Sequence, residues 1–215
     1  MIKAFIFDMD GVIIDSEPLQ LQSFNHVLQA YVKPVIMVEF LKKYMGHQDI
    51  NICAKMVEEL NLPITKEEFI SAKRAAYLEI LKNDIQPIKG AVEAIREIQK
   101  MMPVAVASSS TKLEIEIITK KFGIDDLFSV LISSFEVAQG KPAPDIYLKA
   151  SELLGVPPQE CGAIEDTPLG IVSAKGAGMM YCFGITTTHT ADELVKADKV
   201  ISNFAELVPA IKLLS

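Results

Sequence analysis

The chain has 215 residues, a formal net charge of −7 and a hydrophobic fraction of 50%, so it can bury a full-sized core and is not expected to be disordered. No apolar run approaches the roughly 18 residues of a membrane-spanning helix, and no Lys/Arg-rich patch typical of nucleic-acid binding stands out. The N-terminus lacks the pattern of a signal peptide. We therefore expect a cytoplasmic monomer that binds neither membranes nor nucleic acid.

Short apolar runs rich in β-branched residues alternate with helical segments along the chain. Their apolarity is continuous, which is typical of strands buried on both faces of a parallel sheet. The predicted strands are Ala4–Phe7, Val104–Ala107, Val130–Ile132, Gly162–Ile164 and Met179–Phe183, with a weaker one at Val200–Ile201. Apolar residues at helical spacing predict the intervening helices Ala91–Met101, Leu113–Phe122 and Ile146–Leu154. The pattern predicts an α/β fold with a doubly wound parallel sheet.

The connection between the first two strands is much longer than one crossover helix requires. Helical patterns fill it, beginning with a helix that Ser16 is expected to cap and continuing at Val38–Tyr44, Ile50–Leu60 and Lys66–Lys82. Thr65 is expected to cap the last of these helices. We predict a catalytic core domain of residues 1–15 and 87–215, with an all-helical cap domain of residues 16–86 beside the ligand-binding crevice of the sheet.

Two carboxylates, Asp8 and Asp10, follow the first predicted strand and precede Gly11. Adjacent anions repel each other unless a cation or a shared proton stabilises them, so the pair indicates a hard divalent metal or two carboxyls with separated pKa values. Phosphoryl transfer uses both, with one ionised aspartate as nucleophile and the other as general acid. A simple turn after a strand would also explain this motif.

Hydroxyl groups follow the second predicted strand in the segment that contains Ser108 and Ser109. They lie just before a helix, where hydroxyls and free backbone N–H groups form a phosphate-binding site. A plain helix cap is the alternative, although it needs only one Ser or Thr. Lys141 lies further along in a loop stiffened by Pro142, before a helix that Asp145 is expected to cap. Such stiffening indicates a positioned ammonium group, and an ordinary loop lysine is the alternative.

Glu165 and Asp166 follow the fourth predicted strand. Together with Asp8 and the Asp10 carbonyl they would complete an oxygen shell around Mg²⁺. A helix cap formed by Asp166 or Thr167 would explain one acidic residue but not two. Because the carboxyl ends of parallel strands meet at one edge of a sheet, the four motifs are expected to converge on a single crevice.

In order and spacing, these four motifs resemble those of the haloacid dehalogenase superfamily over essentially the whole chain. The segments Asp15–Pro18 and Gly140–Asp145 are similar to the β-phosphoglucomutase-like phosphatase subfamily. This resemblance implies that Asp8 forms an aspartyl-phosphate, while Asp10 protonates the leaving group and then activates water. The implied activity is hydrolysis of a small phosphate ester such as a sugar phosphate.

The same resemblance implies the remaining roles at the site. Ser108 and Lys141 would hold the phosphate, and Asp166, with Glu165, would bind Mg²⁺ alongside Asp8 and the Asp10 carbonyl.

A β-phosphoglucomutase-type phosphomutase is one alternative function. Such mutases typically carry a histidine in the first lid helix and an arginine soon after a lid glycine. Gln20 and Asp49, which follows Gly46, stand at the corresponding positions, and Asp49 would repel a distal phosphate that an arginine would bind. We expect Gly46, His47 and Lys73 to contact the substrate, although a lid helix exposes its lysines by default.

A phospho-accepting signalling module is an alternative of another class. Receiver domains also combine an aspartate, a metal, a hydroxyl and a lysine on a parallel sheet. Asp10 argues against it because this residue is suited to speed the breakdown of an aspartyl-phosphate. The large helical insert also suits a small substrate better than the docking face of a protein partner.

Overall fold

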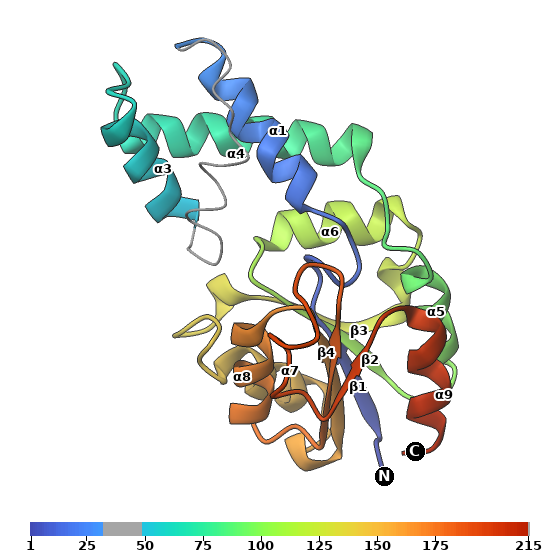
Figure 1. The fold of residues 1–215 in the computed structure, drawn as a ribbon. Coiled ribbons are helices and arrows are strands. Elements are labelled where there is room, and N and C mark those ends of the chain that lie inside the picture. Colours follow the sequence, from blue (N-terminus) through green and yellow to red (C-terminus); the bar gives the residue numbers. More distant parts are fainter. Residues whose placement is uncertain (32–48, 215) are drawn as a thin grey trace. The chain divides into compact units, whose positions relative to one another are not determined.

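The structure, a computed structural model, describes residues 1–31 and 49–214 and consists of two compact units (Figure 1). The core unit comprises Met1–Asp15 and Gln86–Ser215, and the helical unit comprises Ser16–Ile85. Each unit has a hydrophobic core of its own. The predicted helix Val38–Tyr44 lies outside the described residues, as do Gly46 and His47.

A parallel sheet forms the centre of the core unit. Within the described residues it has six strands in the order β3-β2-β1-β4-β5-β6, and all neighbouring strands are parallel. The strands are β1 (Ala4–Phe7), β2 (Val104–Ser108), β3 (Phe128–Ser133), β4 (Cys161–Glu165), β5 (Tyr181–Ile185) and β6 (Lys199–Ile201). Every residue of β1, β2 and β4 is buried, which explains their continuous apolarity. The predicted doubly wound α/β sheet is confirmed.

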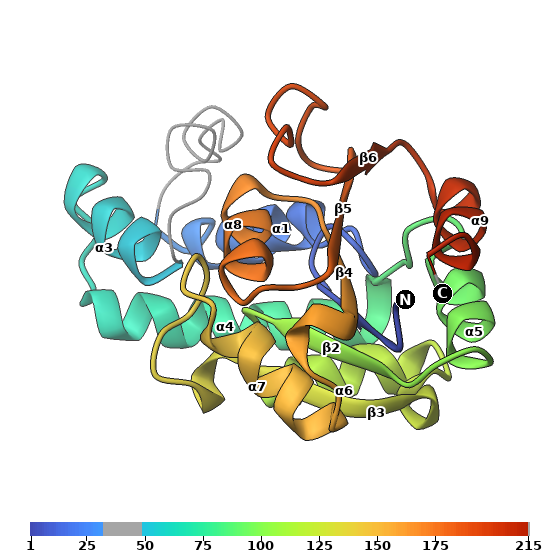
Figure 2. The ribbon, with the colours of Figure 1, turned by 90° about the horizontal axis from the view of Figure 1, so that it is seen from below.

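Helices cover both faces of this sheet, with α7 and α8 against one face and α5 and α9 against the other (Figure 2). The helices of the core unit are α5 (Ala91–Gln99), α6 (Lys112–Lys121), α7 (Asp145–Leu154), α8 (Pro168–Gly176) and α9 (Leu207–Lys212). The helix α5 buries residues 91, 94, 95 and 98, which share one helical face. No helix in the described ranges combines the length and hydropathy needed to cross a bilayer.

The strand β5 begins two residues later than the sequence pattern predicts. Gly178 has a left-handed φ of +79°, and its N–H donates to the Lys175 carbonyl in the turn after α8. The N–H of Met180 donates to the carbonyls of Pro158 at 3.1 Å and of Cys161, the first residue of β4, at 2.9 Å. Met179 and Met180 lie between this turn and β5, so apolarity alone placed the start of the strand too early.

The ends of the helical unit are joined to the core unit by two adjacent segments. Ile14 forms an antiparallel bridge with Pro87, and the N–H of Ile88 donates to the Ile13 carbonyl at 2.9 Å. The chain therefore leaves the core unit and returns to it at neighbouring points.

The described part of the helical unit consists of α1 (Glu17–Leu28), α3 (Asp49–Glu59) and α4 (Lys66–Asp84). No strand occurs among its described residues. All three helices contribute to its core, in which the rings of Phe24 and Phe69 stack with their centroids 6.3 Å apart. This core lets the unit fold around its own apolar residues.

The two predicted helix caps of this unit differ. Thr65 forms a capping box, because its Oγ1 accepts the Glu68 N–H at 3.2 Å and the Glu68 carboxylate accepts the Thr65 N–H at 2.8 Å. Ser16 lies at the N-cap of α1, but its side chain makes no capping hydrogen bond. Its backbone is already helical, at φ −86° and ψ −16°, instead of extended as a cap requires. The expected Ser16 cap is therefore wrong.

We predict that Thr65→Ala destabilises the helical unit by about 1 kcal/mol, because it removes the cap of α4. Ser16→Ala is the matched control and should cost less stability than Thr65→Ala, because the Ser16 side chain makes no capping hydrogen bond. Urea unfolding followed by circular dichroism measures both changes. Equal midpoints for the two variants would contradict the assignment of the caps.

Candidate active site

Three buried carboxylates meet at the carboxyl edge of the sheet. Asp8 follows β1, while Glu165 ends β4 and Asp166 follows it, and β1 pairs directly with β4. One oxygen atom from each of these three residues lies within 4.8 Å of the other two. The structure thus brings together the acidic residues of the first and fourth sequence motifs.

The Lys141 ammonium lies among these carboxylates. Its Nζ contacts Asp8 Oδ1 and donates to the Ala107 carbonyl at 3.0 Å, and it lies 2.6 Å from Glu165 Oε1. Burial lowers the pKa of Lys141, but the charges of Asp8 and Glu165 outweigh burial and raise this pKa above its ordinary value. Lys141 therefore supplies a permanent positive charge to the site.

The loop that carries Lys141 is closed by Asp145. The Asp145 carboxylate accepts the Gln139 N–H at 3.1 Å, while Pro144 occupies the N-cap position of α7. The expectation that Asp145 caps this helix is therefore wrong. Because Asp145 bonds backwards across the loop, it fixes the segment on both sides of Lys141.

Two serines at the end of β2 and just after it contact Asp10. Thr111 caps α6 in a capping box with Glu114, so the serines are not needed as caps. Ser110 Oγ donates to Asp10 Oδ2 at 2.8 Å, and Ser108 Oγ lies 3.4 Å from the same oxygen. Both hydroxyls therefore hold one oxygen of Asp10.

The predicted phosphate-site residue Ser109 has an exposed side chain, and its carbonyl accepts from Ser134 Oγ at 3.2 Å. Its role stays a prediction. The sequence reasoning did not single out Ser110. The pattern Thr111-x-x-Glu114 is a capping-box signature, and it would have indicated that the preceding hydroxyls are available for other contacts.

The site has an excess of negative charge. Burial raises the pKa of Asp8 well above its ordinary value, and Glu165, Asp166 and Asp10 raise it further, while Lys141 opposes them. Burial, with the charge of Glu165, also raises the pKa of Asp166 to about 7. One lysine therefore does not balance the charge of these acids.

Two carboxylate oxygens at the site are buried and have no hydrogen-bond partner among the described residues, Asp10 Oδ1 and Asp166 Oδ1. Buried polar atoms are nearly always satisfied, and hard divalent cations prefer carboxylate oxygens. The cluster of Asp8, Glu165 and Asp166 therefore fits a divalent metal ion.

Two glycines make room for the acidic side chains. Gly11 has a φ of +76°, and a Cβ atom on it would overlap the Asp166 carboxylate. A Cβ atom on Gly170 would overlap the Glu165 carboxylate. Thr167 caps α8 by accepting the Gly170 N–H at 3.1 Å, so Asp166 is not the cap and its carboxylate faces the site.

Further contacts support the acidic residues without any signal in the sequence. Tyr147 OH donates to Glu165 Oε1 at 2.6 Å, and Thr188 Oγ1 donates to Asp166 Oδ2. Tyr147 lies in the apolar stripe of α7, where an aromatic residue is usually part of the core. Thr188 follows β5 in a segment that no motif identified.

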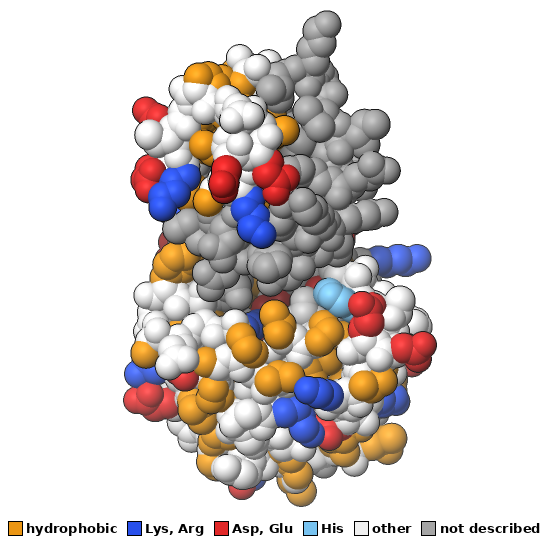
Figure 3. All heavy atoms as spheres, turned by 60° about the vertical axis from the view of Figure 1, so that its left-hand side comes forward, with side chains coloured by type: hydrophobic (Ala, Val, Ile, Leu, Met, Phe, Trp, Pro, Cys, Tyr) orange, Lys and Arg blue, Asp and Glu red, His pale blue; other side chains and the backbone are white. Residues whose placement is uncertain are grey.

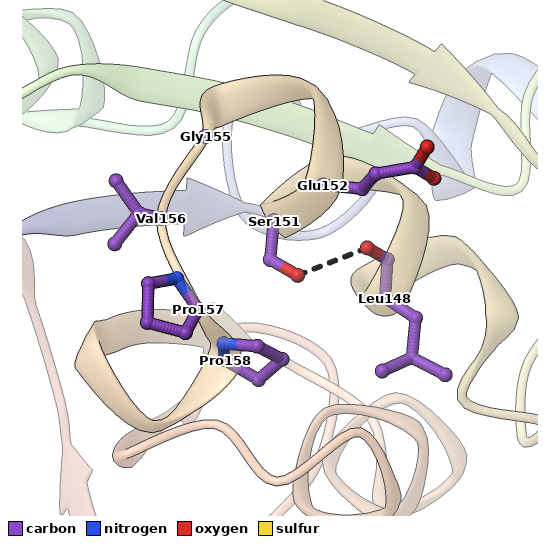
Figure 4. A pocket seen from close by; sticks show the side chains of 7 residues that line it. All are labelled: Leu148, Ser151, Glu152, Gly155, Val156, Pro157 and Pro158. Atoms are coloured by element: carbon purple, nitrogen blue, oxygen red, sulfur yellow. Dashed lines mark hydrogen bonds between the residues drawn. The ribbon is translucent and has the colours of Figure 1, made fainter.

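A separate hollow of about 330 Å³ lies at the C-terminal end of α7 (Figure 4). Its lining includes Gly155, Pro157 and Pro158, which precede β4, whereas Glu165 ends β4 and Asp166 follows it. The Ser151 hydroxyl in its wall donates to the Leu148 carbonyl at 2.9 Å. The hollow is therefore at the opposite sheet edge and does not belong to the acidic site.

Figure 3 shows one face of the core unit. Acidic and basic side chains are interspersed there with hydrophobic ones. Single exposed apolar side chains, such as Leu153 and Leu169, are normal on protein surfaces. The buried acidic cluster remains the candidate site.

In the helical unit, Lys73 is only 4% exposed. Its Nζ donates to Gln20 Oε1 and lies 5.0 Å from the ring centroids of both Phe24 and Tyr77. The expectation that the lid helix exposes this lysine is therefore wrong, because aromatic rings and the Gln20 amide surround it.

Comparisons with known proteins identify the family of this chain. A family model described as haloacid dehalogenase-like hydrolase matches residues 5–184. The chain is 32% identical over 213 residues to the "Probable pseudouridine-5'-phosphatase" of Drosophila melanogaster, covering 95% of this chain and 90% of that protein. It is 29% identical over 221 residues to the "Phosphorylated carbohydrates phosphatase" of Thermotoga maritima, covering 96% of this chain and 100% of that protein.

A crystal structure of CbbY from Rhodobacter sphaeroides in complex with phosphate superposes with a TM-score of 0.83 at 27% identity, covering 97% of both chains. The chain belongs to the haloacid dehalogenase-like hydrolase family. Phosphatases among its relatives, together with the crystal structure of a "putative beta-phosphoglucomutase" from Thermotoga maritima (TM-score 0.87, 26% identity, 100% of both chains), support an enzyme of the phosphatase or phosphomutase type.

We predict that Gly170→Ala destabilises the protein by about 1–3 kcal/mol, because its Cβ atom would displace the Glu165 carboxylate. Gly176→Ala in the same helix is the control, since its Cβ would lie 3.7 Å from Pro144. This substitution should be neutral or should stabilise the protein by up to about 1 kcal/mol. Thermal unfolding compares the two. Equal stability would contradict the close packing of Gly170 against Glu165.

Proposed function

We propose that this protein is a Mg²⁺-dependent phosphatase that hydrolyses a small phosphorylated metabolite, with sugar phosphates as the favoured substrates. The observation that carries this proposal is the contact of Lys141 with Asp8 and Glu165 beside Asp166. A nucleophilic carboxylate, a fixed positive charge and oxygen ligands for a metal are then available at one point. The names of the relatives support a phosphate ester as substrate.

Asp8 is the nucleophile of the proposed reaction. Its carboxylate oxygen attacks phosphorus, and the bond between phosphorus and the ester oxygen breaks, which leaves an aspartyl-phosphate. Asp10 gives its proton to the departing oxygen. Water then attacks phosphorus while Asp10 takes up a proton, and cleavage of the acyl phosphate releases inorganic phosphate and restores Asp8.

Lys141 and the serines support these steps. Lys141 binds a phosphoryl oxygen while staying next to Asp8, and its positive charge offsets charge that develops there. Ser108 and Ser110 hold Asp10 Oδ2, so Oδ1 is the oxygen that exchanges the proton. Ser108 and Ser109 also contribute to phosphate binding.

Asp8, Glu165, Asp166 and the Asp10 carbonyl would hold Mg²⁺. The ion, when bound, supplies positive charge that stabilises the transferring phosphoryl group. The three carboxylates hold one oxygen each within 4.8 Å of the other two, which would suit them to share one ion. The buried, unpartnered Asp166 Oδ1 supports this assignment.

The helical unit is proposed to act as a cap that excludes bulk water and selects the substrate. Gly46, His47 and Lys73 are the proposed substrate contacts. Gln20 and Asp49 favour the phosphatase over the mutase, because they stand where such mutases typically carry a histidine and an arginine. Membership of a hydrolase family also favours turnover over the phosphate storage of a signalling module.

We predict that Asp8→Asn lowers Mg²⁺-dependent phosphate release by roughly 10³-fold or more, because the amide oxygen is a poor nucleophile. Release from p-nitrophenyl phosphate and a panel of sugar phosphates measures this loss. Asp126→Asn, which changes an exposed carboxyl of the core unit, should keep normal activity. Normal turnover by Asp8→Asn would refute the mechanism.

We predict that Asp10→Asn slows turnover about 10²–10⁴-fold, because it removes the general acid and base. Asp8 remains able to accept phosphate from a substrate with a good leaving group, so phosphoprotein should accumulate. Intact-mass spectrometry after mixing with p-nitrophenyl phosphate detects it. The wild-type protein should not accumulate this species, and its absence from the Asp10→Asn variant as well would count against the role of Asp10.

A further inference from the structure

The segment after β5 contacts both acidic loops of the site. Thr187 Oγ1 donates to the Gly11 carbonyl in the loop after β1, and Thr188 Oγ1 donates to Asp166 Oδ2 after β4. Both threonines lie beyond residues 5–184, to which the family model extends. Two neighbouring hydroxyls thus connect this segment to the loops that follow two different strands.

The Thr188 hydroxyl contacts Asp166 at two points. Its Oγ1 donates to Asp166 Oδ2 and also lies 3.2 Å from the Asp166 carbonyl oxygen, and it lies 3.0 Å from Nδ1 of His189. An Nδ1–H on His189 can donate to the remaining lone pair of Thr188 Oγ1. His189, Thr188 and Asp166 then form a chain of hydrogen bonds that ends on one oxygen of Asp166.

This chain distinguishes the two oxygens of Asp166. Oδ2 accepts from Thr188, whereas Oδ1 is buried and has no hydrogen-bond partner among residues 1–31 and 49–214. Asp166 is 2% exposed, so bulk water does not satisfy Oδ1. The carboxylate is also confined by Gly11, where an added Cβ would overlap it and lie 2.9 Å from Thr188 Cγ2.

We propose that Thr188 is a positioning residue for the metal ion. By occupying Oδ2, it holds Asp166 in the rotamer that leaves Oδ1 for the cation next to Asp8 and Glu165. Partners of this kind typically change metal affinity about 10–100-fold when they are removed. This inference rests on the proposed metal-dependent function.

The test measures Mn²⁺ binding to the substrate-free protein by electron paramagnetic resonance. Thr188→Val keeps the branched shape and removes the hydroxyl, so the dissociation constant for Mn²⁺ should rise about 10–100-fold. Thr188→Ser keeps the hydroxyl and should bind like the wild type. Thr186→Val is the control, because the Thr186 hydroxyl contacts the Ile201 carbonyl at 3.5 Å and no acidic residue.

A second readout separates positioning from a general loss of structure. At saturating Mg²⁺ the KM for substrate should be unchanged in Thr188→Val, while the Mg²⁺ concentration that gives half-maximal rate rises by the same factor as the Mn²⁺ dissociation constant. Thermal unfolding without metal checks the fold. If Thr188→Val does not fold, Thr188→Ala is used in its place and is compared with Thr188→Ser.

Wild-type Mn²⁺ affinity in the folded variant without the hydroxyl would overturn the role of Thr188 and leave the proposed function intact. Failure of the wild-type protein itself to bind Mn²⁺ would overturn the metal-dependent function, and the role of Thr188 with it. The two failures are therefore distinguishable.

Discussion

The contact of the Lys141 ammonium with Asp8 and Glu165 is the interaction on which the site depends. Moving a charged group from water into the protein interior costs on the order of several kcal/mol. Only close pairing with an opposite charge offsets this cost. The pairing is incomplete here, because Asp10 and Asp166 add negative charge that one lysine does not balance. A buried excess of negative charge destabilises the protein on its own and favours the binding of a cation.

The sheet order explains how distant parts of the sequence supply this site. β1 lies between β2 and β4, so the residues that follow these three strands are neighbours although they are far apart in the chain. The Lys141 loop reaches the same edge through its closure by Asp145. Rigid strands thus fix the acids and hydroxyls, and short loops determine their final directions.

The strands and the four motifs could be predicted because they depend on local patterns. Continuous apolarity marks β1 and β4, and the acids directly after them show where each strand ends. The roles of Ser16 and Asp145 could not be predicted, since a capping residue is recognised by type, whereas its partner depends on backbone conformation. Tyr147 and Thr188 were missed because a side-chain partner more distant in sequence leaves no periodic signal.

The bridge between Ile14 and Pro87 and the bond between Ile13 and Ile88 bring the two ends of the helical unit together on the core. An inserted domain whose ends are close can be lengthened, replaced or lost without changing the order of the strands. The sheet and its acidic edge can therefore stay constant in evolution while the inserted helices diverge. In such an arrangement the acidic edge and the inserted helices can change independently of each other.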